Sequence, residues 1–129
     1  MRKQCHNPYM PLWEHVPDGE PHVFGDRLYV FGSHDLENGN EFCEQDYVCW
    51  SAPVTDLSDW RCDGVIYKKE QDPYNQDALP LYAPDVVKGP DGRYYLYYCI
   101  KFQDSINVAV CDTPAGEYRC YGRVHDEDG

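Results

Sequence analysis

An internal repeat is the feature of this chain that most restricts the folds it can adopt. Residues 17–67 contain, in order, an acidic residue beside a proline, a short strand (22–24), a Gly/Asp turn and an aromatic strand, and residues 81–124 contain the same order. The two copies are offset by 66 residues at Tyr29 and Tyr95. Four strand patterns in each copy, repeated at a spacing of about 60 residues, are typical of the four-stranded blades of a β-propeller.

The local patterns assign the chain to the all-β class. Ten glycines and ten prolines separate many short segments, and no stretch keeps the 3.6-residue period of an amphipathic helix. We therefore expect two four-stranded antiparallel blades. A propeller needs at least about four blades to close, so we expect an incomplete propeller that is part of a longer chain. The predicted division is a lead-in segment (residues 1–16), blade one (17–67), a connector (68–80), blade two (81–124) and a truncated end (125–129).

Charge and cysteine content restrict the partners and the compartment. The formal net charge of −12 argues against nucleic acid and against membrane surfaces, because both select basic proteins. Seven cysteines without a CxxC pair are expected to be reduced, buried residues of the strands, as in a cytoplasmic protein. The first residues lack the apolar run of a signal peptide or a membrane helix.

Each repeat begins with a carboxylate next to a proline. Pro21 lacks an amide donor and biases Glu20 toward extended backbone, which holds this side chain at the start of a strand, a suitable place for a catalytic group. The alternative is that Glu20 is a solvated charge at a strand edge, as most surface carboxylates are. Asp85 follows Pro84 at the matching place in the second repeat. This recurrence favours a shared function for the two acids.

Six short motifs follow one another along the chain: Asn7-Pro8, Gly19-Glu20-Pro21, Leu28-Tyr29 running into Gly32-Ser33, Tyr82-Ala83-Pro84-Asp85-Val86, and the segments 92–97 and 106–116. Together they resemble glycoside hydrolase family 43. That family contains β-xylosidases, α-L-arabinofuranosidases and arabinanases on a five-bladed β-propeller. The resemblance covers nearly the whole chain from about residue 7, and it implies that the chain aligns with the first two of the five blades.

The resemblance implies an inverting reaction that uses three acidic residues. Glu20 falls on the general base, Asp85 falls on the carboxylate that raises the pKa of the general acid and orients it, and the acid is expected beyond residue 129. The base of the family is normally aspartate, and the extra carbon–carbon bond of Glu20 adds ~1.5 Å. Because a misplacement of ~1 Å can cost on the order of a hundredfold in rate, Glu20 is expected either to sit on a retracted backbone or to be less active. Asp18 and Asp26 are the neighbouring alternatives for the base.

Four further residues are predicted to bind substrate. Ser33, His34 and Asp35 end the second predicted strand, where they would point into the same funnel as the two carboxylates; the alternative is a turn-capping cluster. Tyr82 lies near the start of the second repeat, and its ring would either stack on a sugar or belong to the core. No set of metal ligands is visible, and we expect neither a metal nor another cofactor.

Three functions are compatible with these patterns. The first is the N-terminal part of an inverting glycoside hydrolase that cleaves arabinose- or xylose-containing glycans, so that the partner is a pentose-containing oligosaccharide or polysaccharide. The second is a non-catalytic carbohydrate-binding propeller, which the glutamate at the base position favours. The third is a propeller scaffold without a sugar site. Under the first hypothesis the chain alone is expected to hydrolyse nothing, because it lacks the acid.

Overall fold

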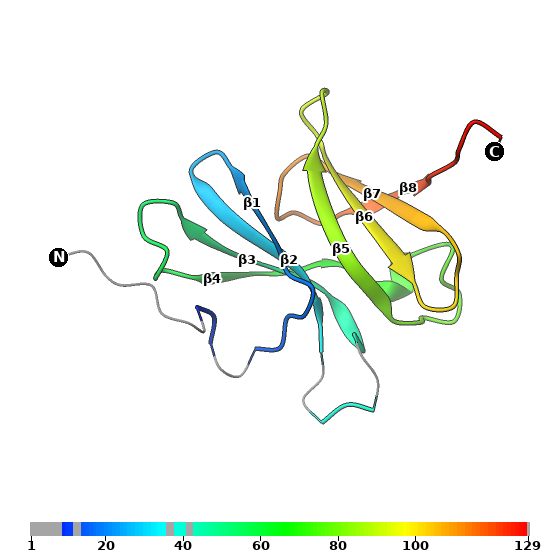
Figure 1. The fold of residues 1–129 in the computed structure, drawn as a ribbon, viewed down its shortest axis with the longest axis horizontal. Helices are drawn as coiled ribbons and strands as arrows, with labels where there is room; N and C mark the ends of the chain where they lie inside the picture. Colours follow the sequence, from blue (N-terminus) through cyan, green and yellow to red (C-terminus); the bar gives the residue numbers. More distant parts are fainter. Residues whose placement is uncertain (1–8, 12–13, 36–37, 41–42, 129) are drawn as a thin grey trace.

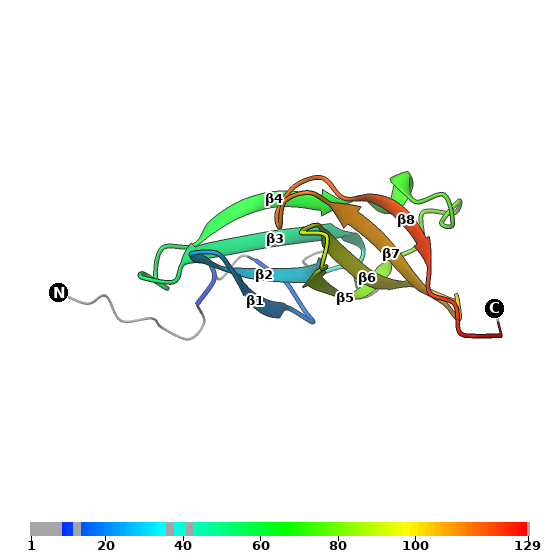
Figure 2. The ribbon, with the colours of Figure 1, turned by 90° about the horizontal axis from the view of Figure 1, so that it is seen from above.

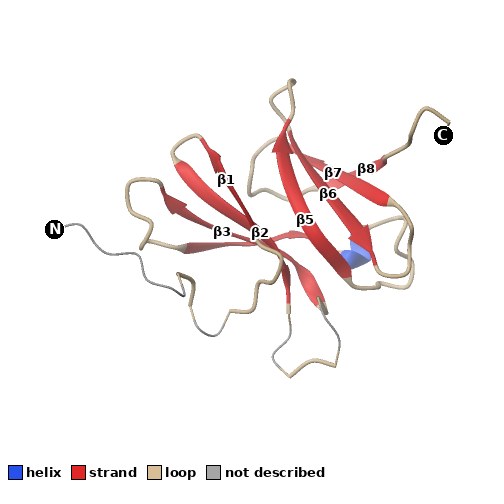
Figure 3. Cartoon of the chain, viewed as in Figure 1, coloured by secondary structure: helices blue, strands red, loops and turns tan. Residues whose placement is uncertain are grey.

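The computed structural model of the protein describes residues 9–11, 14–35, 38–40 and 43–128. Its strands form two antiparallel four-stranded sheets, with the orders β1-β2-β3-β4 and β5-β6-β7-β8 (Figure 1). The first sheet consists of β1 (Glu20–Phe24), β2 (Arg27–His34), β3 (Gln45–Pro53) and β4 (Arg61–Tyr67), and the second of β5 (Leu81–Lys88), β6 (Tyr94–Ile100), β7 (Ile106–Cys111) and β8 (Arg119–Arg123). The segment between the sheets contains the short 3-10 helix η1 (Lys69–Gln71) (Figure 3).

The all-β class and the two four-stranded antiparallel units are confirmed. Strand β1 begins at Glu20, two residues earlier than expected. Pro21 is accommodated there because β1 is an edge strand, where a missing amide donor need not break the ladder. In the part of the chain that the structure describes, no helix has the length and apolar character needed to cross a membrane.

The hairpin of β1 and β2 has a two-residue turn between Phe24 and Arg27, which pair with each other. Gly25, the first residue of this turn, has a φ of 65°. Tight hairpin turns need a positive φ at this position, which glycine adopts without steric cost. The Gly/Asp turn of the sequence therefore sets the register of the first hairpin.

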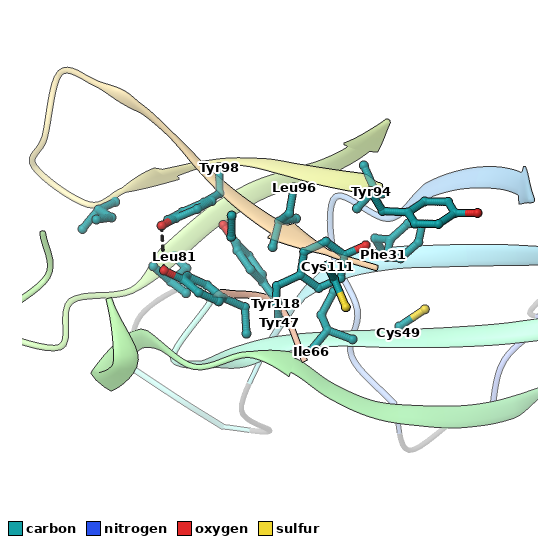
Figure 4. Packing of buried hydrophobic residues seen from close by; sticks show 14 residues of the cluster. Phe31, Tyr47, Cys49, Ile66, Leu81, Tyr94, Leu96, Tyr98, Cys111 and Tyr118 are labelled. Carbon is teal, nitrogen blue, oxygen red and sulfur yellow. Dashed lines mark hydrogen bonds between the residues drawn. The ribbon is translucent and has the colours of Figure 1, made fainter. Parts of the chain in front are cut away.

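The hydrophobic core lies between the two sheets, as the close view in Figure 4 shows. Along β6, Tyr94, Leu96 and Tyr98 are buried, while the residues between them are more exposed. This period of two is the pattern of a strand with one face on the core. The first sheet adds Phe31, Tyr47, Cys49, Ile66 and Tyr67, and the second adds Leu81, Val86, Ile100, Ala109 and Cys111. Tyr118, from the segment before β8, also belongs to this core.

Hydrogen bonds also hold the second sheet in place against the first. The Tyr47 hydroxyl donates to the backbone oxygen of Tyr82 at 2.7 Å, which ties β3 to β5. The amide of Tyr118 donates to the backbone oxygen of Ile66 at 2.9 Å, which ties β4 to the segment before β8. Any site between β1 and β5 depends on this placement.

Residues 14–19 cover the other face of the first sheet. A Cβ atom on Gly32 would lie 2.1 Å from Cγ1 of Val16, so the segment approaches β2 as closely as it does because residue 32 is glycine. The amide of Asp35 donates to the backbone oxygen of His15 at 2.8 Å. The lead-in segment is therefore attached along the end of β2.

Candidate active site

The edge strands β1 and β5 lie side by side where the two sheets meet (Figures 1 and 2). Each strand carries one of the two proline-flanked carboxylates. Glu20 opens β1, and Asp85 lies within β5. The packing of the sheets thus brings together two segments that are far apart in the sequence.

Glu20, His22 and Phe24 share one face of β1, because side chains alternate between the faces of a strand. The ring of Phe24 packs edge-on against Tyr94 of β6, with the ring centroids 5.0 Å apart, so this face turns toward the second sheet. Glu20 is exposed and pairs with the fully buried Phe31 of β2. An exposed carboxylate on this face can reach water, as a general base must.

The two alternative bases lie elsewhere along the same segment. Asp18 has a φ of 56° in the turn before β1. Asp26 lies in the turn after β1, at the opposite end of the strand from Glu20. Of these three carboxylates, Glu20 is therefore the one that begins β1, and it lies on the face of β1 that turns toward the second sheet.

A β-bulge determines which face of β5 bears the Asp85 side chain. Tyr82 pairs with Cys99, and Asp85 pairs with Tyr97. The two intervening residues of β5 therefore oppose a single residue of β6. The first of them, Ala83, has a φ of 41°, a strained conformation for a residue with a Cβ atom. Regular alternation would put Tyr82 and Asp85 on opposite faces of β5, whereas the bulge puts both on one face.

The Asp85 carboxylate meets the imidazole of His22. Nε2 of His22 lies 2.6 Å from Oδ1 of Asp85, and the amide of Val86 donates to the same oxygen at 2.8 Å. The side chains of His22 and Asp85 are 33% and 58% exposed, so a ligand can reach both. His22 is absent from the predicted site; its one sequence signal is its place two residues after Glu20, on the same face of a strand.

Ser33 is a buried residue, and Asp35 accepts a hydrogen bond from the backbone of a neighbouring segment. Ser33 is fully buried, and its side chain lies beside the thiol of Cys43. Oδ1 of Asp35 accepts a hydrogen bond from the amide of Cys43 at 2.6 Å, which joins the end of β2 to the residues before β3. This bond is of the kind expected from a turn-capping residue. A direct contact of either residue with sugar stays a prediction.

His34 is directed toward the lead-in segment. Its Nε2 lies 2.9 Å from Oε1 of Glu14, and Nε1 of Trp50 donates to Oε2 of the same carboxylate at 2.7 Å. The Glu14 side chain is only 7% exposed. Because Trp50 and Glu20 belong to opposite faces of the first sheet by strand register, the structure does not bring His34 to Glu20. The contacts of the His34 side chain are thus with the lead-in segment and not with the predicted funnel. A role of His34 in sugar binding stays a prediction.

Glu14 is a residue that the sequence patterns did not single out. It lies in a segment without periodicity, so no local signal marks its carboxylate as buried. Burial of a charged group is compensated only by charge-assisted partners, and these come from β2 and β3. Its contacts stabilise the attachment of the lead-in segment.

Tyr82 is half-buried and shares the face of β5 that bears Asp85. Its proposed stacking on a sugar stays a prediction. Within the described ranges, no group of three or more His, Cys, Asp and Glu side chains is arranged to hold a metal ion. The expectation of no metal and no cofactor likewise stays a prediction.

Two curated relatives resemble this chain over most of its length. The "Xylosidase/arabinosidase" of Thermoclostridium stercorarium is 62% identical over 130 residues, which cover 100% of this chain and 28% of the relative. The "Extracellular endo-alpha-(1->5)-L-arabinanase" of Thermotoga petrophila is 30% identical, over 91% of this chain and 27% of the relative. The chain thus spans less than a third of the length of either relative.

Two solved structures are also similar to this chain. The RS223 β-xylosidase superposes with a TM-score of 0.68 at 28% identity, over 84% of this chain and 36% of that protein. A family 43 enzyme of Xanthomonas citri in complex with xylose superposes with a TM-score of 0.68 at 26% identity, over 91% of this chain and 38% of the enzyme. The sequence profile of the family described as "Glycosyl hydrolases family 43" matches residues 15–128. The chain therefore belongs to glycosyl hydrolase family 43.

Proposed function

We propose that this chain contributes Glu20 as the general base and Asp85 as the pKa-modulating carboxylate of an inverting glycoside hydrolase that acts on arabinose- or xylose-containing glycans. The observation that carries the proposal is the contact between β1 and β5. The face of β1 that bears Glu20 also bears His22, which lies 2.6 Å from Asp85. Both carboxylates thus belong to neighbouring strands and face solvent. No residue of this chain is assigned as the general acid.

In an inverting reaction, water attacks the anomeric carbon from the side opposite the leaving oxygen. The base takes a proton from this water, and the acid donates one to the leaving group from roughly 6.5–9.5 Å away. Glu20 suits the first role because it is exposed at the start of an edge strand, where water has access. Its strand is held by the buried core beneath Phe31, which limits the movement of the base.

Asp85 acts on the acid through its charge. A carboxylate close to a second carboxyl group disfavours ionisation of that group and so raises its pKa. Oδ1 of Asp85 is occupied by His22 and the amide of Val86. Oδ2 is then the oxygen that the general acid approaches.

The pentose assignment is supported by the names of the relatives, which are xylosidases, arabinosidases and arabinanases. Tyr82 lies on the same face of β5 as Asp85, and its ring is proposed to stack on a sugar, as aromatic rings with one polar end do in half-buried sites. The partner of the chain is accordingly a pentose-containing oligosaccharide or polysaccharide.

A non-catalytic carbohydrate-binding function is the second candidate. The observation that favours it is the Glu20 side chain, which has one carbon more than the aspartate expected at the base position and is exposed. A carboxylate with one more rotatable bond places its oxygens less reproducibly, and such displacement is costly for proton transfer. Sugar binding tolerates it better.

The test is a chimera in which this chain replaces the matching segment of the Thermoclostridium stercorarium enzyme, to which it is 62% identical. Turnover is measured with aryl β-xyloside and aryl α-arabinofuranoside. We expect the chimera to be active with inversion at the anomeric carbon, and Glu20→Gln to lower kcat by on the order of 10²–10⁴. Glu127→Gln, at an exposed residue near the C-terminus, is the matched control and should leave kcat unchanged.

Azide distinguishes the two candidates further. In the Glu20→Ala chimera, azide should enter the space of the lost carboxylate and attack without proton removal, so activity returns with formation of a glycosyl azide. A chimera that binds xylo-oligosaccharides without hydrolysing them, beside an active parent enzyme, would favour the binding function. Full activity in Glu20→Gln would place the base elsewhere.

A further inference from the structure

We propose that Phe102 is a distal sugar-binding residue, on which a pentose unit remote from the reacting bond of a long glycan stacks. The inference rests on the proposed function, because it takes a pentose-containing polysaccharide as the ligand. It adds a binding position outside the carboxylates and Tyr82. Three observations support it: the backbone conformation of Phe102, the exposure of its ring and the hydrogen bonds that hold its turn.

Phe102 occupies a turn position that normally belongs to glycine or asparagine. The amide of Gln103 donates to the backbone oxygen of Ile100 at 3.1 Å, which closes a four-residue turn between β6 and β7 with Phe102 as its third residue. Phe102 has a φ of 65°, and a positive φ at this position favours glycine or asparagine. A bulky side chain is strained there, so phenylalanine costs stability that glycine would not.

The ring of Phe102 gains little burial in return for this strain. Its exposed fraction is 85%, the highest among the large hydrophobic residues that the structure describes. Nζ of Lys101 lies over the ring, 4.8 Å from its centroid, and the high exposure leaves the other face of the ring to solvent. The fold therefore gains little from this side chain, and strained residues of this kind cluster at ligand-binding sites.

Hydrogen bonds to two other segments hold the turn in place. The amide of Lys101 donates to the backbone oxygen of Pro80 at 3.0 Å, and Nε2 of Gln103 donates to the backbone oxygen of Tyr74 at 2.8 Å. Nη2 of Arg123 in β8 donates to Oε1 of Gln103 at 2.8 Å. The ring is therefore presented on a preorganised turn, and little loop entropy is lost when it binds a ligand.

The turn lies at the end of the second sheet where β5 begins. Ile100, the last residue of β6, pairs with Leu81, and Cys99 pairs with Tyr82. Strands β1 and β5 run in the same direction (Figure 1), so β1 begins with Glu20 at the corresponding end of the first sheet. The exposed ring and the proposed catalytic base therefore lie at the same ends of their sheets.

The length of β5 separates Phe102 from the reacting sugar. Strand β5 contacts β1 at Asp85, four residues after Leu81, which corresponds to ~13 Å of extended strand. The turn lies beyond Leu81. A small aryl glycoside bound at Glu20 does not span this distance, whereas a polysaccharide does. Binding of the polymer at the turn raises its effective concentration at the catalytic end of β1.

A purely structural role for Phe102 predicts a different effect on stability. If another part of a longer chain packed on the ring, Phe102→Gly would remove that contact and lower the melting temperature. If the ring contacts only glycan, Phe102→Gly relieves strain that exceeds the entropic cost of glycine, and it should raise the melting temperature. Under the proposal, stability therefore rises while polysaccharide binding falls.

The experiment uses the chimera with the Thermoclostridium stercorarium enzyme and compares Phe102→Gly and Phe102→Trp with the parent chimera. Binding is measured by retardation in gels that contain soluble arabinoxylan or arabinan, and kcat/KM is measured on both polysaccharides and on the two aryl glycosides. We expect Phe102→Gly to weaken the retardation and to lower kcat/KM on the polymer, through KM, by roughly threefold to tenfold. The aryl glycosides should be cleaved as before. Phe102→Trp should retain both polymer properties, because it keeps an aromatic face.

Val54→Ala is the matched control. Val54 is an exposed apolar residue in the turn after β3, and its amide donates to the backbone oxygen of Asp26 at 2.9 Å. It therefore lies beside the hairpin turn of β1 and β2, at the opposite end of the first sheet from Glu20. This variant should equal the parent chimera in retardation and in kcat/KM on every substrate.

Three results would overturn the inference: unchanged polysaccharide binding in Phe102→Gly, a loss of kcat/KM that is equal on polymer and aryl glycoside, or a lower melting temperature of Phe102→Gly. Failure of the proposed function has another signature, which is a chimera without turnover on any substrate. Gel retardation still reports on Phe102 in that case, because it needs no hydrolysis. An inactive chimera whose retardation is lost in Phe102→Gly supports the distal contact, and one that neither polysaccharide retards refutes it.

Discussion

The hydroxyl groups of Tyr67 and Tyr98 lie 2.9 Å apart in the core between the two sheets. Both hydroxyl groups also contact one carboxylate oxygen of Asp72, a residue that is only 3% exposed. Tyr67 lies 3.0 Å from this oxygen, and Tyr98 donates to it as well. The other carboxylate oxygen of Asp72 accepts a hydrogen bond from the amide of Tyr74 at 2.7 Å. A strand from each sheet and the connector therefore meet at one buried carboxylate.

Replacing Asp72 by alanine is expected to lower the free energy of unfolding by about 2–5 kcal/mol, because buried phenol groups would lose their charged acceptor. Asp72→Asn keeps one oxygen acceptor and should cost less. Urea unfolding followed by circular dichroism measures both losses. Asp77→Ala, at an exposed residue of the same connector, is the control, and an Asp72→Ala loss no larger than that of the control would contradict the assignment.

Alkaline pH is expected to destabilise the fold. Burial raises the pKa of Tyr47, Tyr67, Tyr98 and Tyr118 in the folded state, whereas an unfolded tyrosine titrates near ~10. Above ~10 the unfolded chain loses protons that the folded chain keeps, so each such tyrosine lowers the free energy of unfolding by ~1.4 kcal/mol per pH unit. Below ~10 this contribution is fully present.

Unfolding in urea between pH 8 and 11 tests this dependence; these values bracket the ordinary tyrosine pKa of about 10. Tyr118→Phe should reduce the slope by the share of one tyrosine. Tyr121→Phe, at a residue that is 61% exposed, should leave the slope as it is. A stability that stays constant across this pH range would show that the phenols ionise in the folded protein.

The carboxyl of Asp91 has a pKa lowered to about 2, first because the Tyr95 hydroxyl donates to it and next because the amide and guanidinium of Arg93 do so. We expect Tyr95→Phe to raise this pKa toward its ordinary value. The favourable interaction is present above the ordinary aspartate pKa and is lost as the pH falls through about 2. The measurement is the carboxyl ¹³C shift against pH. Tyr97→Phe is the matched control, and an unchanged Asp91 pKa in Tyr95→Phe would contradict the stated cause.

Removal of the Glu14 carboxylate should loosen the lead-in segment. Glu14→Ala eliminates the group that accepts from Trp50 at 2.7 Å and contacts His34 at 2.9 Å, and hydrogen bonds to charged groups contribute about 1.5–3 kcal/mol each. We expect a loss of about 2–4 kcal/mol in the free energy of unfolding and a red shift of the tryptophan fluorescence. Glu70→Ala, at an exposed residue, should change neither. Equal stability of the two variants would mean that the buried carboxylate is dispensable.

Much of the fold could be predicted from the sequence because its determinants are local. The aromatic run from Tyr94 to Tyr98 indicates a strand, because aromatic residues are enriched in strands, and Gly25 with Asp26 indicates the hairpin turn. Both signals need only a few consecutive residues. The recurrence of the blade pattern and the family motifs are also written along the chain, so the two-blade architecture and the family followed from them.

The arrangement of the candidate site followed from the sequence only in part. The proline-flanked acids were visible, but His34 was placed with them because it ends a strand next to that of Glu20. The structure turns its imidazole to Glu14, since a buried carboxylate from an aperiodic segment offers a charged partner. No pattern within β2 contains this information.

Local sequence patterns thus determine the positions of the strands, the turns and the two acids beside Pro21 and Pro84. They do so through side-chain preference and backbone restriction. The tertiary structure alone decided that His22 meets Asp85 and that Tyr82 shares a face with Asp85. The physical reason is that alternation describes one strand at a time. Contacts between strands of different sheets depend on how the sheets pack and on register, and one bulge with a strained Ala83 is enough to reverse the face that alternation assigns.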